Sequence, residues 1–296
     1  MSIPPPTDWA GLYHAYGRAA DVPGHLAALS DSDPAVRRAA TSALADRVCH
    51  QGTRWPAGAH VVAPLVALVD TPSTPDRAAV LRVLHAVALG DLDDDALPFD
   101  PVQGFADADR VRPADEEAVL RVLFEEEDDP DIEAVADVAD VADAVAVHWA
   151  AEAYRAAGRH TASFLRWLHD PDPAVVAHAA ALLVWFAPLP GLPGALAAVP
   201  SDTPATRASA NLALAHLPGH PAPDEREALT RGLASPDETV RITAAIALAH
   251  RQPTALPDRA LTTLAHADAT AVRGTVDGWH RPLRGHVATA LRRLGL

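Results

Sequence analysis

The sequence offers almost no sulfur chemistry. Cys49 is the single cysteine among 296 residues. One thiol cannot form an internal disulfide, which excludes the disulfide-stapled class of small secreted domains. The first residues, MSIPPPTDW, contain neither the positive segment nor the apolar run of a secretory signal. These two absences predict a cytoplasmic protein.

Lysine is absent and aromatic residues are scarce. All 24 basic residues are arginine, and Phe, Trp and Tyr make up 5% of a chain that is 49% hydrophobic. Most of the apolar surface therefore comes from Ala, Leu and Val. Alanine is the best helix former and lets neighbouring helices approach closely. The composition thus predicts an all-α fold with closely packed helices.

Long hydrophobic runs are also missing. The longest uncharged stretch covers residues 173–201, but Pro188, Pro190 and Gly191 interrupt it. Each remaining piece is shorter than the roughly 20 apolar residues that a membrane-spanning helix needs. We expect two buried helices here and no membrane span.

One local pattern recurs along the chain. Its clearest copies are centred on Val36, Val175 and Val240, each with a leucine seven positions before it and another eight positions after it. Weaker copies are centred on Asp76, Ile132, Thr206 and Val272. Recurrence of one local unit along a chain is the signature of a repeat protein.

Each copy begins with the residues that start a helix. Capping side chains lie three positions before the centres, at Asp33, Ser73, Asp129, Asp172, Thr203 and Asp237. Proline follows at positions 34, 130, 173 and 204, where a helix does not need the missing N–H. We expect the arginine after each centre to bond the capping residue or nearby carbonyls, at Arg37, Arg77, Arg207, Arg241 and Arg273.

These copies resemble the HEAT-like repeats of phycobilisome lyases, in which Asp-Pro-x-Val-Arg-x-x-Ala opens the second helix of a pair. The resemblance covers residues 23–89 and 115–280, and residues 9–17 and 50–56 resemble a subgroup of uncharacterised bacterial HEAT proteins. It implies a HEAT-like α-solenoid over residues 1–296, built from about seven helical hairpins. Some proteins of this kind are immunity partners that neutralise bacterial toxins. Lyase activity is not implied, because no chromophore site is evident.

Two segments depart from the repeat. Residues 90–114 lack helical periodicity and contain several prolines, so we expect an acidic loop inserted between repeats. Residues 284–296 are expected to form a helix that caps the carboxyl-terminal end, with Arg292 and Arg293 in its last turn.

Negative charge is concentrated in one part of the chain. Residues 91–143 hold 20 Asp and Glu against three Arg, a balance of −17, whereas the whole chain carries −15. Such a field repels nucleic acid and attracts basic proteins. We therefore predict a non-enzymatic scaffold that binds a basic protein, with a toxin as one possibility. The partner-binding residues are expected to be Asp91, Asp93, Asp94, Asp95, Glu125, Glu126, Glu127, Asp128 and Asp129.

Two alternatives stay open at this point. The acidic segment could be a solvated face that only maintains solubility. The chain could also be a DNA-binding or DNA-glycosylase-like HEAT protein, which would require an arginine-lined groove. If the acidic side chains are exposed, neutralising Asp93, Asp94 and Asp95 together should slow binding and leave the fold intact.

A second contact cluster is expected at His50, Gln51, Thr53 and Trp55, after a helix that Gly52 ends in a left-handed conformation. Trp55 and Trp279 lie beside prolines and are candidates for exposed contact anchors. Cys49 and His50 are neighbours that point in different directions on a helix, so we predict no catalytic residues. No zinc motif is present, and we predict neither a metal nor a cofactor.

Overall fold

The computed structural model of the chain describes residues 7–124, 132–200 and 202–296. The chain is mostly helical (69% helix), and the described residues form fifteen α-helices and two short β-hairpins. The all-α prediction is confirmed. None of the helices in the described ranges is long and apolar enough to cross a membrane, and residues 173–201 hold two separate helices.

Contacts divide the chain into two compact units. The first unit holds residues up to Asp91 together with Asp100–His160, and the second holds Leu92–Phe99 together with Thr161–Leu296. The predicted inserted loop is thus shared between the two units, because its residues 92–99 pack with the carboxyl-terminal half.

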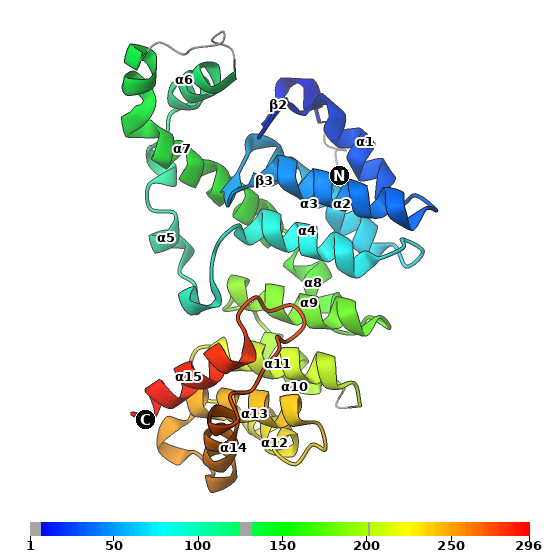
Figure 1. Cartoon of the computed structure of the whole chain (residues 1–296), viewed down its shortest axis with the longest axis vertical. Helices are drawn as coiled ribbons and strands as arrows, with labels where there is room; N and C mark the ends of the chain where they lie inside the picture. The colour runs from blue at the N-terminus through cyan, green and yellow to red at the C-terminus, as the bar shows by residue number, and fades with distance from the viewer. Residues whose placement is uncertain (1–6, 125–131, 201) are drawn as a thin grey trace. The chain divides into compact units, whose positions relative to one another are not determined.

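The first unit contains two β-hairpins and seven α-helices among its described residues (Figure 1). Its elements are η1 (Trp9–Gly11), β1 (Tyr13–His14), β2 (Gly17–Arg18), η2 (Ala19–Asp21), α1 (Val22–Ala28), α2 (Pro34–Val48), β3 (Cys49–His50), β4 (Thr53–Arg54), α3 (Pro56–Asp70), α4 (Arg77–Leu89), α5 (Pro101–Gly104), η4 (Ala108–Arg110), α6 (Pro113–Phe124) and α7 (Ile132–Gly158). Helices adjacent in sequence pack in pairs, α1 with α2, α3 with α4 and α6 with α7.

The second unit is built from eight α-helices among its described residues. Its elements are η3 (Asp94–Ala96), α8 (Thr161–Trp167), α9 (Pro173–Leu183), η5 (Val184–Phe186), α10 (Leu192–Ala198), α11 (Pro204–His216), α12 (Pro223–Gly232), α13 (Glu238–Arg251), η6 (Pro253–Ala255), α14 (Asp258–Ala269) and α15 (Leu283–Arg293). Helix α11 packs between α9 and α13, and the three lie side by side in Figure 1.

The segment over residues 90–114 is not wholly irregular. It carries the short elements η3, α5 and η4, and α6 begins at Pro113 inside the expected range. A helix was also expected over residues 284–296, and α15 occupies most of this range.

The repeat turns are held by the predicted capping residues. The side chain of Asp33 accepts the N–H of Ala35 at 2.7 Å, and that of Asp172 accepts the N–H of Ala174 at 2.9 Å. Asp237 caps α13 in the same way. These contacts satisfy backbone donors that a helix start leaves free.

Three of the weaker copies depart from this pattern. Thr203 precedes α11 but its side chain makes no capping hydrogen bond. Helix α4 begins after Asp76, so Ser73 is not its cap. The sequence around Val272 forms a turn and irregular backbone rather than a helix start. Asp129 and Pro130 lie outside the described residues.

At two of the clearest repeats, the arginine that follows the centre bonds carbonyls of the turn between the paired helices. Arg37 donates to the carbonyls of Asp31 and Ser32 at 2.8 and 3.0 Å. Arg241 donates to the carbonyls of residues 235 and 236, at the same sequence offsets, at 2.9 and 2.7 Å. The expected bonding of these arginines to nearby carbonyls is confirmed at both repeats.

Arg207 makes the same kind of contact from a buried position. It is 1% exposed and donates to the carbonyl of Val199 at 3.1 Å and to the Asn211 side chain at 2.9 Å. Burial lowers the pKa of Arg207 to about 10, so the group stays charged at pH 7. The carbonyl oxygens at the end of α10 stabilise this charge.

Alanine fills the space between α9, α11 and α13. Ala177, Ala210, Ala213 and Ala244 are fully buried in these helices. Side chains this small let helix backbones approach closely, as the composition predicted. The contact among these three helices is therefore set by backbone proximity.

We predict that Asp172→Ala lowers the free energy of unfolding by about 1 kcal/mol, because the N–H of Ala174 loses its acceptor. Thr203→Ala is the matched control, since Thr203 has the same position in its repeat without a capping bond. Urea unfolding followed by circular dichroism measures both. Equal losses in the two variants would show that the cap contributes nothing.

Candidate functional site

The acidic residues of the predicted partner site do not form one group in the structure. Asp91 belongs to the first unit, whereas Asp93, Asp94 and Asp95 belong to the second. Asp91 is exposed, and its carboxylate lies so close to Gly52 that a Cβ there would collide with it. Glu125, Glu126, Glu127, Asp128 and Asp129 lie outside the described residues.

The three consecutive aspartates have different environments, and only two are exposed. Asp93 accepts the N–H of Asp95 at 3.0 Å and caps the short helix η3. Asp94 is 6% exposed and accepts the backbone N–H of Arg281 at 3.2 Å. Asp95 forms an ion pair with the Arg281 side chain.

The expectation that all three aspartates are exposed is therefore wrong for Asp94. Neutralising the three together would remove a buried acceptor and an ion pair within the second unit. Such a variant would alter the fold as well as the surface charge. A test of surface charge needs other carboxylates.

The second predicted cluster lies on a β-hairpin instead of a helix end. Helix α2 ends at Val48, and Cys49–His50 pairs with Thr53–Arg54 in antiparallel register. Gln51 and Gly52 form the turn with φ values of 48° and 80°. The left-handed conformation of Gly52 was expected, but it closes a two-residue hairpin turn, which needs positive φ at both positions.

Trp55 is a core residue and not an exposed anchor. Its ring stacks on Trp149 with centroids 5.4 Å apart and meets Phe124 edge to face at 5.5 Å. Trp279 is likewise buried, at 4% exposure. The prediction of two exposed tryptophan anchors is wrong, because neighbouring prolines do not determine burial.

The amino-terminal hairpin β1–β2 brings an exposed tyrosine to His50. Tyr16 is 57% exposed, and its hydroxyl donates to Asp46 Oδ2 at 2.6 Å. His50 Nδ1 lies 2.9 Å from Asp46 Oδ1 and 3.2 Å from the Tyr16 hydroxyl. The hydrogen bond to Asp46 raises the pKa of Tyr16. These hydrogen bonds hold the exposed ring of Tyr16 in place at the surface. We call this group of Tyr16, Asp46 and His50 the Tyr16 cluster.

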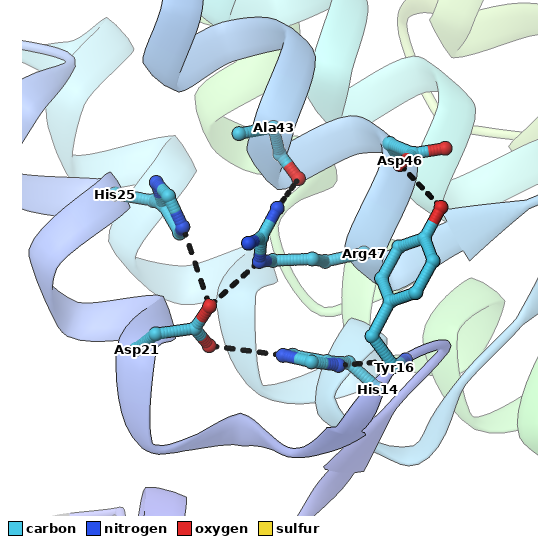
Figure 2. Close-up of polar contacts among 7 residues, drawn as sticks. All are labelled: His14, Tyr16, Asp21, His25, Ala43, Asp46 and Arg47. Carbon is cyan, nitrogen blue, oxygen red and sulfur yellow. Dashed lines mark hydrogen bonds and ion pairs between the residues drawn. The ribbon is translucent and has the colours of Figure 1, made fainter.

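Asp21 joins this hairpin to helices α1 and α2 (Figure 2). Its carboxylate lies 2.9 Å from His14 Nε2, 2.6 Å from Arg47 Nε and 3.4 Å from His25 Nε2. Burial opposes ionisation of Asp21, but its bonds to Arg47 and His14 outweigh that effect and lower its pKa to about 2. The carboxylate is therefore ionised throughout the neutral range.

The histidine and the thiol near this surface are poorly suited to catalysis. His14 Nδ1 accepts the backbone N–H of Tyr16 at 3.0 Å, so its Nε2 carries the proton that Asp21 accepts. Both ring nitrogens are thus engaged. Burial raises the pKa of the Cys49 thiol, which disfavours the reactive thiolate. No group of three metal-ligating side chains that could hold an ion occurs in residues 7–124, 132–200 and 202–296.

Sequence reasoning found His50 but missed Tyr16, Asp46 and Asp21. The distances along the chain explain this, because Tyr16 meets Asp46 and His50 across 30 and 34 residues. The segment from Tyr13 to Arg18 does carry a hairpin signal, since Gly17 has a φ of 118° that favours glycine.

No protein-family model matches the chain, and no curated protein matches it.

We predict that Asp21→Asn lowers the free energy of unfolding at pH 7 by about 1 kcal/mol, a value discounted for the 42% exposure of the side chain. The folded pKa of Asp21 is about 2, below its ordinary value of 3.8. Its stabilisation is therefore complete above pH 3.8 and is lost as the pH falls through 2. Denaturant unfolding at pH 7 and at low pH measures this, with Asp268→Asn on the exposed surface of α14 as control.

Proposed function

We propose that the chain is a HEAT-like interaction protein without enzymatic activity, and that its acidic segment binds a basic protein. The observation that carries the proposal is the concentration of negative charge in one segment. Residues 91–143 have a net charge of −17, whereas the whole chain has a net charge of −15. Potentials of this kind steer oppositely charged partners and raise their association rate.

The packing of the helices supports a HEAT-like arrangement within each unit. Neighbouring helices form seven pairs in the described residues, α1/α2, α3/α4, α6/α7, α8/α9, α10/α11, α12/α13 and α14/α15. The second helices of successive pairs also contact one another. In the first unit α2 contacts α4 and α4 contacts α7, and in the second unit α9 contacts α11 and α11 contacts α13. Stacking of each repeat on the next is how solenoids are stabilised.

The exposed acids of the first unit are the best described candidates for steering. Glu117 on α6 and Asp140 and Asp143 on α7 are exposed. Other acids of this unit are already neutralised locally, as in the ion pairs of Arg112 with Asp115 and of Arg155 with Asp109. Toxin neutralisation is one form of this function, and a neighbouring gene for a secreted toxin would favour it.

The buried or bonded state of the repeat arginines argues against the DNA-binding alternative. The guanidinium groups of Arg37, Arg207 and Arg241 donate hydrogen bonds to backbone carbonyls of the preceding turn. A guanidinium held in this way cannot also form the phosphate contacts that dominate DNA affinity.

We predict that the triple variant Glu117→Gln, Asp140→Asn, Asp143→Asn binds immobilised polylysine about threefold more slowly than the natural chain at low salt. The difference should shrink as salt rises, because the Debye length falls to about 8 Å at physiological ionic strength. Biolayer interferometry across a series of salt concentrations measures both effects.

The matched control is Asp224→Asn, Glu227→Gln, Asp268→Asn, which removes the same charge from exposed positions on α12 and α14. Equal slowing in the two triple variants would mean that only net charge matters, and the proposal would fail. Binding of duplex DNA more tightly than polylysine would favour the alternative function instead.

A further inference from the structure

The second unit contains a polar cavity that the proposed protein binding does not use. It has a volume of about 330 Å³ and lies between the carboxyl ends of α11 and α13, helix α15 and the segment that contains Asp94. This volume is within the range of small-molecule sites. All of its lining residues belong to the second unit.

Three histidines with unsatisfied ring nitrogens line the cavity. His216 is 9% exposed and His286 is 3% exposed, and His250 lies against His216 with ring centroids 5.5 Å apart. The Nε2 atom of each is buried without a hydrogen-bond partner among the described residues. Buried polar atoms nearly always form hydrogen bonds. Three buried nitrogens without partners in one cavity therefore favour the binding of a ligand or of ordered water there.

Trp279 fixes the orientation of two of these rings. It stacks on His216 with centroids 5.5 Å apart and meets His286 edge to face at 5.7 Å. Its indole N–H donates to Ser209 at 2.9 Å, which holds the tryptophan itself in place. The histidines are therefore preorganised and do not need to rearrange to meet a ligand.

Burial and neighbouring charges keep the histidines neutral. Burial is the main cause that lowers the pKa of His216 to about 3 and that of His250 to about 4, and the charges of Arg281 and Arg293 act in the same direction. Both arginines line the cavity. Arg251 lines it as well, so three arginines meet here in a chain whose net charge is −15.

Negative groups also face the cavity, and most of them already have partners. Asp95 pairs with Arg281, and burial raises the pKa of Asp94 toward its neutral form. The carbonyls at the end of α11 are met by Arg251, which donates to Leu214 at 2.8 Å.

Arg251 also pairs with the buried carboxylate of Glu225 at 3.1 Å. Asp94 Oδ2 lies 3.7 Å from His286 Nε2, beyond hydrogen-bond distance. The three Nε2 atoms and the Arg293 guanidinium are therefore left to meet a ligand.

We propose that this cavity binds a small anionic molecule through a phosphate or similar oxyanion group. Arg293 supplies the charge, and His216 and His286 supply N–H donors from fixed rings. Charge-assisted hydrogen bonds from arginine are the strongest contacts available to an oxyanion. A metal ion fits less well, because no set of three ligating groups around one point occurs in the described part of the chain.

His250 links this binding to proton uptake. The backbone of Ala215 accepts a hydrogen bond from the His250 ring, and since Nε2 has no partner this bond comes from Nδ1. The Nε2 of neutral His250 therefore carries a lone pair, which an anion repels. Bound anion raises the pKa of His250 above its free value of about 4, so affinity rises as the pH falls toward 4.

Isothermal titration calorimetry of the full chain with inorganic phosphate and with sulfate tests the site. Arg293→Gln should weaken sulfate binding about tenfold, because it removes a charge-assisted contact. Arg292→Gln is the matched control, since it lies in the same helical turn and has the same charge but does not line the cavity. It should leave the affinity unchanged.

Sulfate keeps its charge between pH 7 and 5, so it reports the protonation of the protein alone. Its affinity for the natural chain should increase several-fold over this range, and His250→Gln should remove most of the increase. NMR signals of His216, His250 and His286 should shift on titration.

The proposal is overturned by absence of sulfate and phosphate binding at millimolar concentration, or by equal affinity in Arg293→Gln and the natural chain. Stronger binding of methylammonium than of sulfate would overturn it as well. Circular dichroism of both variants checks that a lost affinity does not reflect a lost fold.

Discussion

Helix ends impose the constraint on which the rest of this structure depends. Every helix leaves its last carbonyls without partners, and a chain of short helices has many such ends. Alanine-rich helices pack closely, so these carbonyls are brought against the next helix with little room for water. An arginine one position after the repeat centre reaches back to such carbonyls at Arg77, which donates to Val69 of α3, and at Arg207, which donates to Ala197 of α10. Arg37 and Arg241 instead donate, at identical offsets, to carbonyls of the turn itself. These four turns are thereby closed by a charged donor.

This use of arginine determines where charge can act. Guanidinium groups consumed in the turns, with Arg207 the most buried, contribute little positive field at the surface. The carboxylates of residues 91–143 have too few arginines near them to be balanced. The arginines that stabilise the turns are thus not available to balance the surface carboxylates, and the surface is acidic. Arginines outside the turns remain available for other contacts, as Arg293 does beside the histidine cavity.

The local parts of the fold could be predicted from the sequence, and the long-range parts could not. Asp33 and Asp172 act as caps because capping depends on residues two or three positions away. Asp94 was expected on the surface because its neighbours are charged, yet it packs against Arg281, 187 residues later. Trp55 was expected to be exposed and Tyr16 was missed for the same reason, since burial depends on which distant segment covers a side chain. Periodicity carries no information on that choice.

The carboxyl-terminal segment has a further effect on the second unit. Gly278 has a φ of 88°, and its backbone lies so close to Ala177 and Ala181 that a Cβ would collide with helix α9. Only glycine permits this approach, and it places Trp279 against Ser209 of α11. Part of the face that α9 and α11 would offer to a partner is thus covered by the chain itself. A basic partner must use another surface of the molecule, which is why the exposed acids of α6 and α7 are better candidates than the inner helices of the second unit. The histidine cavity lies where α11, α13, α15 and the Asp94 segment meet without filling the space between them, so its polar lining is available to a small ligand and not to a protein surface.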